Sequence, residues 1–330
     1  MLELFRRFRR PWVPQVIKFT PSGDFTCVGT MSGKIWVLNF PNGDPARIFG
    51  KLNSGITALD VSSDGNIIVG ASIRGEMAAW DFNTGEIVVK FQKKADTIRT
   101  LEISRDNKWV LAGADFGTSF GTSLWDLKSG KYIKDVLLHR DYVTQVAFER
   151  NGNRMISSSM DGKLSIAPFN SKPYGPWKDV EEYLEEFGHR EVIETPYTIK
   201  CFVETHDGRY IITGHGNHLI INNTFELIDE ARAMIWEKES KEFVQEFIGH
   251  KDHIVKVDIS PDDRYLISAS SPLDAAPTFI ALWDVKTGEP LCLIENPHYI
   301  GMTSIAFSPD GKWLISSAID GTIRIWKVNA

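Results

Sequence analysis

The stretch TSIAFSPDGKWLISSAIDGTIRIWKV, residues 303–328, decides the fold. Two turn signals, SPDG at 308–311 and DG at 320–321, separate three short runs of β-branched and aromatic residues. Proline fixes φ at the second position of a turn, and Asp and Gly tolerate the backbone conformations that close a hairpin. The stretch therefore predicts three antiparallel strands in one compact unit, the last of which carries Trp326.

This unit recurs along the chain with a period of about 43 residues. One interval, between the fourth and fifth copies, is longer at 69 residues. The equivalent third-strand positions of the seven copies are Leu38, Trp80, Trp125, Ala167, Trp236, Trp283 and Trp326. After most copies a TG or SG turn leads into a further apolar run, so the sequence predicts seven units of four strands.

The repeated dipeptides carry a family resemblance. WD occurs at 80–81, 125–126 and 283–284, and GH at 249–250. With these motifs in phase, the chain resembles the WD-repeat (WD40) family of β-propellers over nearly its whole length. The resemblance implies an all-β fold, a single seven-bladed β-propeller of four-stranded antiparallel blades spanning 1–330, in which neighbouring blades bury one another's faces. The approximate repeats are 11–50, 51–93, 94–138, 139–195, 196–248, 249–296 and 297–330.

The last copy ends after its third strand, and spare residues precede the first copy. The usual closure of such propellers implies that 1–10 supply the outer strand of the last blade. This segment carries a candidate anion-binding patch, formed by Arg6, Arg7, Arg9 and Arg10. Charge on an edge strand protects it against pairing with another sheet, which is the commoner role. The alternative is a patch for RNA or an acidic membrane surface.

Composition limits the classes of function. The 330 residues are 42% hydrophobic and 24% charged with a net charge of −6, which indicates a soluble globular protein without overall basic character. The three cysteines, at 27, 201 and 292, lack the spacing of a metal site and predict buried free thiols in a reducing compartment. We expect no signal peptide and no membrane span, and a cytoplasmic location, or a nuclear one if the cell has a nucleus.

The resemblance also implies a polar relay in each blade, in which a Trp indole, a Ser or Thr hydroxyl, a His and an Asp form hydrogen bonds in series. Only the seventh repeat matches in full, with His298, Ser316, Asp320 and Trp326. The fourth repeat has Ala167 in place of the Trp, and repeats one, three and five lack the His. Because the relay accounts for these residues, we interpret them as structural and predict no catalytic triad.

Departures from the repeat are candidate sites of individual function. Insertions at 116–121, 216–230 and 271–278 fall between second and third strands, and one at 170–195 falls on the opposite face. Within 171–190, the run KDVEEYLEEF at 178–187 predicts a helix with one apolar stripe. The helix either packs on the propeller's own rim or docks a partner. We also expect a small hairpin within LIINNTFELID at 219–229.

Large side chains are predicted to gather on one face of the propeller. We call it the top face: it holds the loops that lead into each blade and the turns between second and third strands. The candidate partner-binding residues there are Trp12, Arg74, Arg99, Tyr142, Met160, Tyr197, His253, Tyr299 and Ile319. Aromatic, Arg and Met residues carry much of the binding energy at protein interfaces. We expect about half of the nine to be exposed, the others packing between loops.

The sequence therefore predicts a non-catalytic protein-interaction scaffold that binds one or more proteins through the top face. An RNA- or ribonucleoprotein-associated propeller that uses the N-terminal arginines is the alternative. A third hypothesis is a metal-dependent enzyme centred on His215 and His218, but no carboxylate or thiol completes that set. We predict no cofactor, no metal and no small-molecule substrate, and the sequence does not name the partner.

Overall fold

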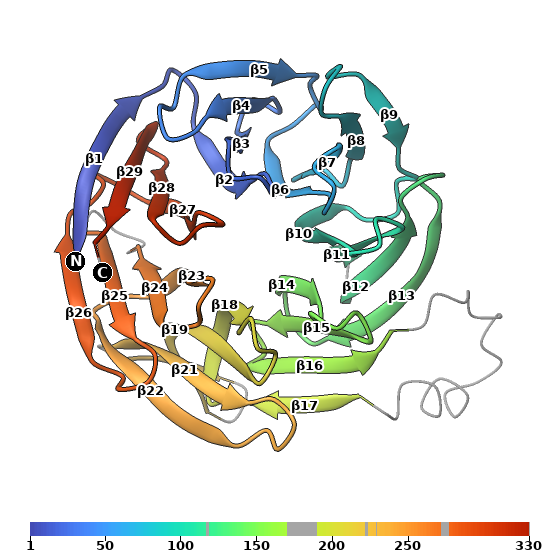
Figure 1. Cartoon of the computed structure of the whole chain (residues 1–330). Helices are drawn as coiled ribbons and strands as arrows, with labels where there is room; N and C mark the ends of the chain where they lie inside the picture. Colours follow the sequence, from blue (N-terminus) through green and yellow to red (C-terminus); the bar gives the residue numbers. More distant parts are fainter. Residues whose placement is uncertain (117–118, 170–189, 222–223, 229, 272–276, 330) are drawn as a thin grey trace, which may run out of the picture.

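A computed structural model describes residues 1–116, 119–169, 190–221, 224–228, 230–271 and 277–329. Seven antiparallel sheets are arranged as blades around a central channel (Figure 1). The predicted seven-bladed all-β propeller is confirmed. The predicted helix at 178–187 lies outside the described residues. Within the described part, no helix is long and apolar enough to cross a membrane.

Blades one to four follow one another in chain order. The first comprises β2 (Pro14–Phe19), β3 (Phe25–Thr30), β4 (Ile35–Asn39) and β5 (Pro45–Phe49). The second comprises β6 (Ile56–Val61), β7 (Ile67–Ser72), β8 (Met77–Asp81) and β9 (Ile87–Lys90). The third comprises β10 (Thr97–Ile103), β11 (Trp109–Phe116), β12 (Ser119–Asp126) and β13 (Tyr132–His139). The fourth comprises β14 (Val143–Phe148), β15 (Arg154–Ser159), β16 (Lys163–Pro168) and β17 (Glu191–Glu194).

The last three blades complete the ring. The fifth comprises β18 (Tyr197–Glu204), β19 (Tyr210–Ile221), β20 (Thr224–Leu227), β21 (Ala231–Glu237) and β22 (Phe243–His250). The sixth comprises β23 (Ile254–Ile259), β24 (Tyr265–Ser270), β25 (Phe279–Asp284) and β26 (Pro290–Glu295). The seventh comprises β27 (Met302–Phe307), β28 (Trp313–Ala318), β29 (Thr322–Val328) and β1 (Leu2–Arg9). In the fifth blade β19 pairs with β20, which confirms the small hairpin.

The ring closes through the two ends of the chain. β1 pairs antiparallel with β29, so the strand order of the seventh blade is β1-β29-β28-β27. The backbone N–H of Asn329 donates to the carbonyl of Met1 at 2.9 Å, and both chain ends lie at this blade (Figure 1). An outer strand from the N-terminus thus covers the edge that β29 would otherwise expose.

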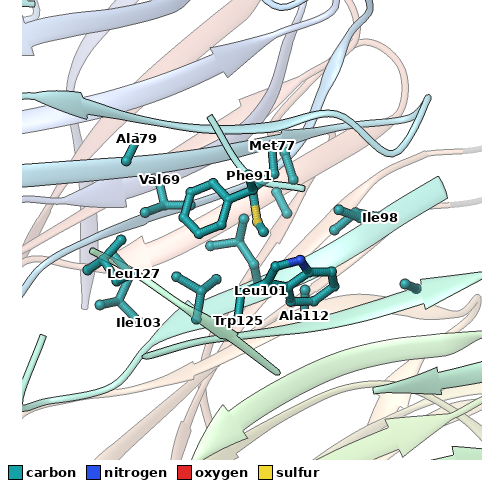
Figure 2. Packing of buried hydrophobic residues seen from close by; sticks show 14 of the residues in the cluster. Val69, Met77, Ala79, Phe91, Ile98, Leu101, Ile103, Ala112, Trp125 and Leu127 are labelled. Atoms are coloured by element: carbon teal, nitrogen blue, oxygen red, sulfur yellow. The ribbon is translucent and has the colours of Figure 1, made fainter. Parts of the chain in front are cut away.

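The core lies between neighbouring blades. Figure 2 shows the cluster between blades two and three, where Val69 and Phe91 of the second blade pack with Leu101 and Trp125 of the third. The second strands are apolar on both faces, because each face meets another blade; β7, for example, is buried from Ile68 onward. This packing makes the propeller a rigid support for its loops.

An ionic network joins blades four and five on the face opposite the top. The carboxylate of Glu149 is fully buried and accepts a hydrogen bond from Nη2 of Arg154 at 2.6 Å. It also pairs with Lys238, whose Nζ lies 2.8 Å from Oε1 of Glu204. Other blades place a Ser or Thr at the position of Glu149, as Ser308 does in the seventh blade. The hydroxyl of Ser308 donates to Asp310 within its own turn, whereas Glu149 joins two blades through its charge.

Candidate functional site

A repeated backbone hydrogen bond defines equivalent positions on the top face. The residue that follows the second strand donates its N–H to a carbonyl in the loop that leads into the same blade. The donors are Met31 in blade one, Ile73 in blade two, Met160 in blade four, Ser271 in blade six and Ile319 in blade seven, with N···O distances of 2.9, 3.1, 3.0, 3.3 and 2.8 Å. The side chains of Met31, Ile73 and Ile319 are 65, 52 and 44% exposed, whereas Met160 is half-buried and Ser271 is buried. The main chain thus presents an apolar side chain to solvent at the same place in three adjacent blades.

The leading loop of blade seven extends this surface. Tyr299 is 88% exposed, and Ile300 beside it is also exposed. We define the apolar arc as Met31, Ile73, Tyr299, Ile300 and Ile319. Apolar residues scattered singly over a surface are normal, so it is their repetition at one position of neighbouring blades that makes the arc a candidate binding site. The sequence reading missed Met31, Ile73 and Ile300, although their equivalence with Ile319 could be found by aligning the repeats.

The nine candidate residues on the top face differ in exposure. Arg74, Tyr299 and Ile319 are exposed and belong to blades two and seven, where the arc lies. Trp12 is buried and stacks on Trp36, with ring centroids 5.3 Å apart. Trp12 therefore fills the junction between blades seven and one and does not reach the surface.

Two further candidates, Arg99 and Tyr142, meet at blades three and four. The guanidinium of Arg99 lies over the ring of Tyr142, 4.2 Å from its centroid. Arg99 also forms an ion pair with Asp115, with Nη2 and Oδ2 2.9 Å apart. Both side chains remain exposed, but their polar and aromatic groups already contact each other.

The remaining three candidates, Met160, Tyr197 and His253, are half-buried. The Sδ atom of Met160 lies 3.9 Å from Nζ of Lys200. Tyr197 packs edge-on against the ring of His215 at 5.7 Å. Burial lowers the pKa of His253, against the opposing effect of Asp252, whose carboxylate accepts a hydrogen bond from its ring. These residues support the loops more than they present a surface.

The relay residues of the seventh blade form one chain of hydrogen bonds. The indole of Trp326 donates to Oγ of Ser316 at 3.0 Å, and that hydroxyl lies 2.8 Å from Nε2 of His298. Thr322 stands between His298 and Asp320: its Oγ1 lies 2.6 Å from Nδ1 of the ring and donates to the carboxylate over 2.6 Å. The sequence reading missed Thr322, because the motif joins His directly to Asp.

The relay also holds the top face. The second carboxylate oxygen of Asp320 accepts the backbone N–H of Tyr299 at 3.0 Å. Burial, with a further effect of Arg324, lowers the pKa of His298 to about 3, so the ring is neutral and bridges two hydroxyls. The relay therefore fixes the loop that carries Tyr299 and leaves His298 without a catalytic role.

Blades five and six contain variants of this relay. In blade six Trp283 donates to Ser268 at 2.7 Å, and Nε2 of His250 lies 2.6 Å from the same hydroxyl. In blade five Trp236 donates to Thr213 at 2.9 Å, and Nε2 of His215 lies 2.8 Å from Thr213 Oγ1. The reading that the fifth repeat lacks the His is thus wrong: its His comes from β19.

This position decides how His215 is interpreted. The side chain is fully buried, and burial with Arg232 nearby lowers its pKa to about 3. Its Nε2 is engaged by a hydroxyl, so His215 belongs to the blade core. In the part of the chain that the structure describes, no three His, Cys, Asp or Glu side chains come together as a metal site would require.

Comparison with known proteins agrees with the repeated four-stranded blades. The family model described as "WD40: WD domain, G-beta repeat" matches residues 130–166, 241–274 and 291–327. Each matched segment begins at the outer strand of one blade and continues into the next blade. The chain carries WD40 repeats and folds as a seven-bladed β-propeller.

Several curated proteins are similar to this WD-repeat propeller. Periodic tryptophan protein 2 of Arabidopsis thaliana is 23% identical over 92% of the chain and 30% of its own length. The U3 small nucleolar RNA-associated protein 21 of Saccharomyces cerevisiae is 25% identical over 64% of the chain and 19% of its own length. The Target of rapamycin complex subunit wat1 of Schizosaccharomyces pombe is 38% identical over 25% of the chain and 25% of its own length. The chain thus spans less than a third of each relative's length.

The N-terminal arginines of this WD-repeat propeller differ in their surroundings. Arg6, Arg7 and Arg9 are exposed on β1, and Arg6 lies 3.6 Å from the carboxylate of Asp44. Arg10 is half-buried and donates to the carbonyl of Gly43 at 2.6 Å, so it contributes to the closure. The candidate anion-binding patch is therefore reduced to three exposed arginines.

Proposed function

We propose that this WD-repeat propeller is a non-catalytic scaffold that binds a partner protein through the apolar arc of its top face. The observation that carries the proposal is that blades seven, one and two, which are neighbours in the ring, each present an exposed apolar side chain at the same position. A rigid ring presents these side chains, so little conformational entropy is lost when a partner covers them.

The composition of the arc suits a protein partner. Tyr, Met and Arg are enriched at the buried centres of protein interfaces, and Tyr299, Met31 and the neighbouring Arg74 supply one of each. Burial of a large apolar side chain contributes about 1.5–3 kcal/mol. A partner that covers the five residues would thus gain a substantial part of its binding free energy there.

The names of the relatives support a role in assemblies. One is a subunit of a target of rapamycin complex, and another is associated with the U3 small nucleolar RNA. We propose that this chain likewise works within a larger assembly, with its partner still to be identified. The segment 171–190, of which 171–189 lie outside the described residues, is a second candidate docking element. We propose that the protein is cytoplasmic, or nuclear in a cell that has a nucleus.

A second candidate function is association with RNA through the outer strand of blade seven. Arg7 pairs in register with Arg324 of β29, so the exposed arginines of β1 continue onto the next strand. Replacement of Arg6, Arg7 and Arg9 by Gln should then weaken RNA binding and flatten its salt dependence. Absence of RNA binding at low salt would exclude this function.

Affinity purification from the native cell tests the scaffold. The test variant is Ile73→Ser with Tyr299→Ala, and the matched control is Leu291→Ser with Leu293→Ser on the exposed outer strand of blade six. The arc variant should lose a stoichiometric partner that the wild type and the control retain. Retention by the arc variant together with loss by the control would contradict the proposal. Deletion of 171–190 in a parallel sample tests the second docking element.

A further inference from the structure

The upper end of the central channel is built from two rings of side chains. Each innermost strand has a register shift at the same level, where one residue bulges out of the pairing. The seven bulged residues are Gln15, Thr57, Arg99, Thr144, Lys200, Val255 and Thr303. The residues that follow them are Val16, Ala58, Thr100, Gln145, Cys201, Lys256 and Ser304. All fourteen line one cavity of about 210 Å³.

The bulges explain why both rings reach the channel. Successive residues of a regular strand point to opposite faces, whereas a bulge re-aims a side chain. Lys200 and Cys201, for example, are consecutive and both line the cavity. The cavity is several times the ~30 Å³ that one water molecule occupies in the liquid, so it has room for a small ligand.

The charges of the two rings are all positive. They hold three cations, Arg99, Lys200 and Lys256, and no carboxylate. Arg99 is paired with Asp115, but the two lysines are not paired in this way. Lys256 donates to the amide oxygen of Gln145 at 2.9 Å, and Lys200 contacts Met160 as described above. Among the residues that the structure describes, neither lysine forms an ion pair with a carboxylate.

Unpaired lysines in a confined site are costly, because burial removes water from the ammonium group. Burial lowers the pKa of both Lys200 and Lys256, against the opposing charges of Asp141 and Asp252 at Lys200 and of Asp258 and Glu102 at Lys256. An anion between them would restore the lost solvation through charge-assisted hydrogen bonds. The two lysines lie on adjacent blades, five and six, and both line the cavity.

Carboxylates do occur deeper in the channel, but they are engaged by the wall. Asp60 accepts the backbone N–H of Ile103 at 2.9 Å and pairs with Lys18 at 3.4 Å. Asp258 accepts the N–H of Phe307 at 2.8 Å. Glu102, which also lines the cavity, accepts an N–H from the fourth blade at 3.2 Å. These groups join neighbouring blades, and Glu102 is the one among them that lines the cavity, together with the cations Lys18, Arg99, Lys200 and Lys256.

We propose that the upper channel binds a phosphate group, held by Lys200 and Lys256. The group belongs either to a free phosphorylated small molecule or to a phosphorylated side chain of a partner. This site is independent of the apolar arc, which lies on blades seven, one and two. Loss of either site therefore leaves the other intact.

Phosphorus-31 NMR and thermal denaturation of the whole chain test the site. The probes are inorganic phosphate, pyrophosphate, and a short peptide with and without one phosphoserine, all at constant ionic strength. The wild type should bind at least one phosphate probe with saturation and melt at a higher temperature. Binding of phosphate or pyrophosphate assigns a free ligand, and binding of the phosphopeptide alone assigns a partner's side chain.

Variants locate the site. Lys200→Gln and Lys256→Gln should each weaken binding by about tenfold or more, equal to about 1.4 kcal/mol. Lys286→Gln, the same change on an exposed loop of blade six, and the arc variant should bind as the wild type does. If a Gln variant fails to fold, Lys200→Arg and Lys256→Arg should retain binding because they keep the charge. Absence of saturable binding to the wild type, or wild-type affinity in both Gln variants, would overturn the proposal.

Discussion

The indole N–H of Trp326 donates to Oγ of Ser316 over 3.0 Å, and this bond connects the core of the seventh blade to its top face. Ser316 passes the connection to His298, and the relay ends at the backbone of Tyr299. The second blade has no such relay: Gly70 stands at the position of the serine. The indole N–H of Trp80 has no acceptor among the described residues.

This contrast predicts unequal effects of one substitution. Trp326→Phe removes a hydrogen bond and leaves the hydroxyl oxygen of Ser316 without its indole donor. Trp80→Phe removes a buried N–H that has no acceptor in the first place. Trp326→Phe should therefore lower the free energy of unfolding by about 1 kcal/mol more than Trp80→Phe. Chemical denaturation of both variants checks this. Equal losses would show that the relay adds nothing to packing.

Stability should fall on acidification below about pH 6.5. The pKa values of His298 and His215 are lowered to about 3 and that of His250 to about 4, each chiefly by burial. The unfolded chain therefore binds protons that the folded chain does not, at about 1.4 kcal/mol per pH unit for each histidine.

Glu102 opposes this effect. Burial, followed by the charge of Asp60, raises the pKa of Glu102 to about 7, so its contribution is present at low pH and is lost as pH rises through that value. The free energy of unfolding should therefore fall by roughly 3 kcal/mol between about pH 6 and pH 5. Glu102→Gln should steepen it. Denaturation midpoints that do not change with pH in this interval would contradict the account.

The closure of the ring predicts a position-dependent effect along β1. Leu2 is 9% exposed and packs with Trp326, whereas Leu4 on the same strand is 44% exposed. Leu2→Ala should cost about 2 kcal/mol of stability, and Leu4→Ala less than about 1. Thermal denaturation of the two variants gives the comparison. A larger loss from Leu4→Ala would mean that β1 does not close the blade as described.

The ionic network between blades four and five predicts a similar contrast. Glu149→Gln removes the fully buried carboxylate that Arg154 and Lys238 share and leaves Lys238 paired with Glu204 alone, so it should cost about 3 kcal/mol. Glu239, also in contact with Arg154, is exposed, so Glu239→Gln should cost less than about 1 kcal/mol. Urea denaturation at low and high salt checks both values. Similar small losses would show that the buried network is not needed.

The fold could be predicted from the repeats because turn residues and strand-forming runs recur in phase. The candidate site was harder to predict from the sequence, for two physical reasons. The exposure of Met31, Ile73 and Ile319 depends on how the loops around each of them pack, since Met160 makes the same backbone bond and is half-buried. His215 reaches the relay from within β19, so a motif read in sequence order assigns it to a loop. Trp12 shows the reverse case, since an aromatic residue in a loop can fill a junction.

Crosslinking in the native cell, through a photo-reactive amino acid incorporated into the protein, tests the central claim most directly. Position 299 lies in the apolar arc, and position 291 on the outer strand of blade six is a matched exposed site. The account predicts a crosslinked adduct with a partner protein at position 299 and none at position 291. An adduct at 291 with none at 299 would contradict the claim that the top face is the docking surface.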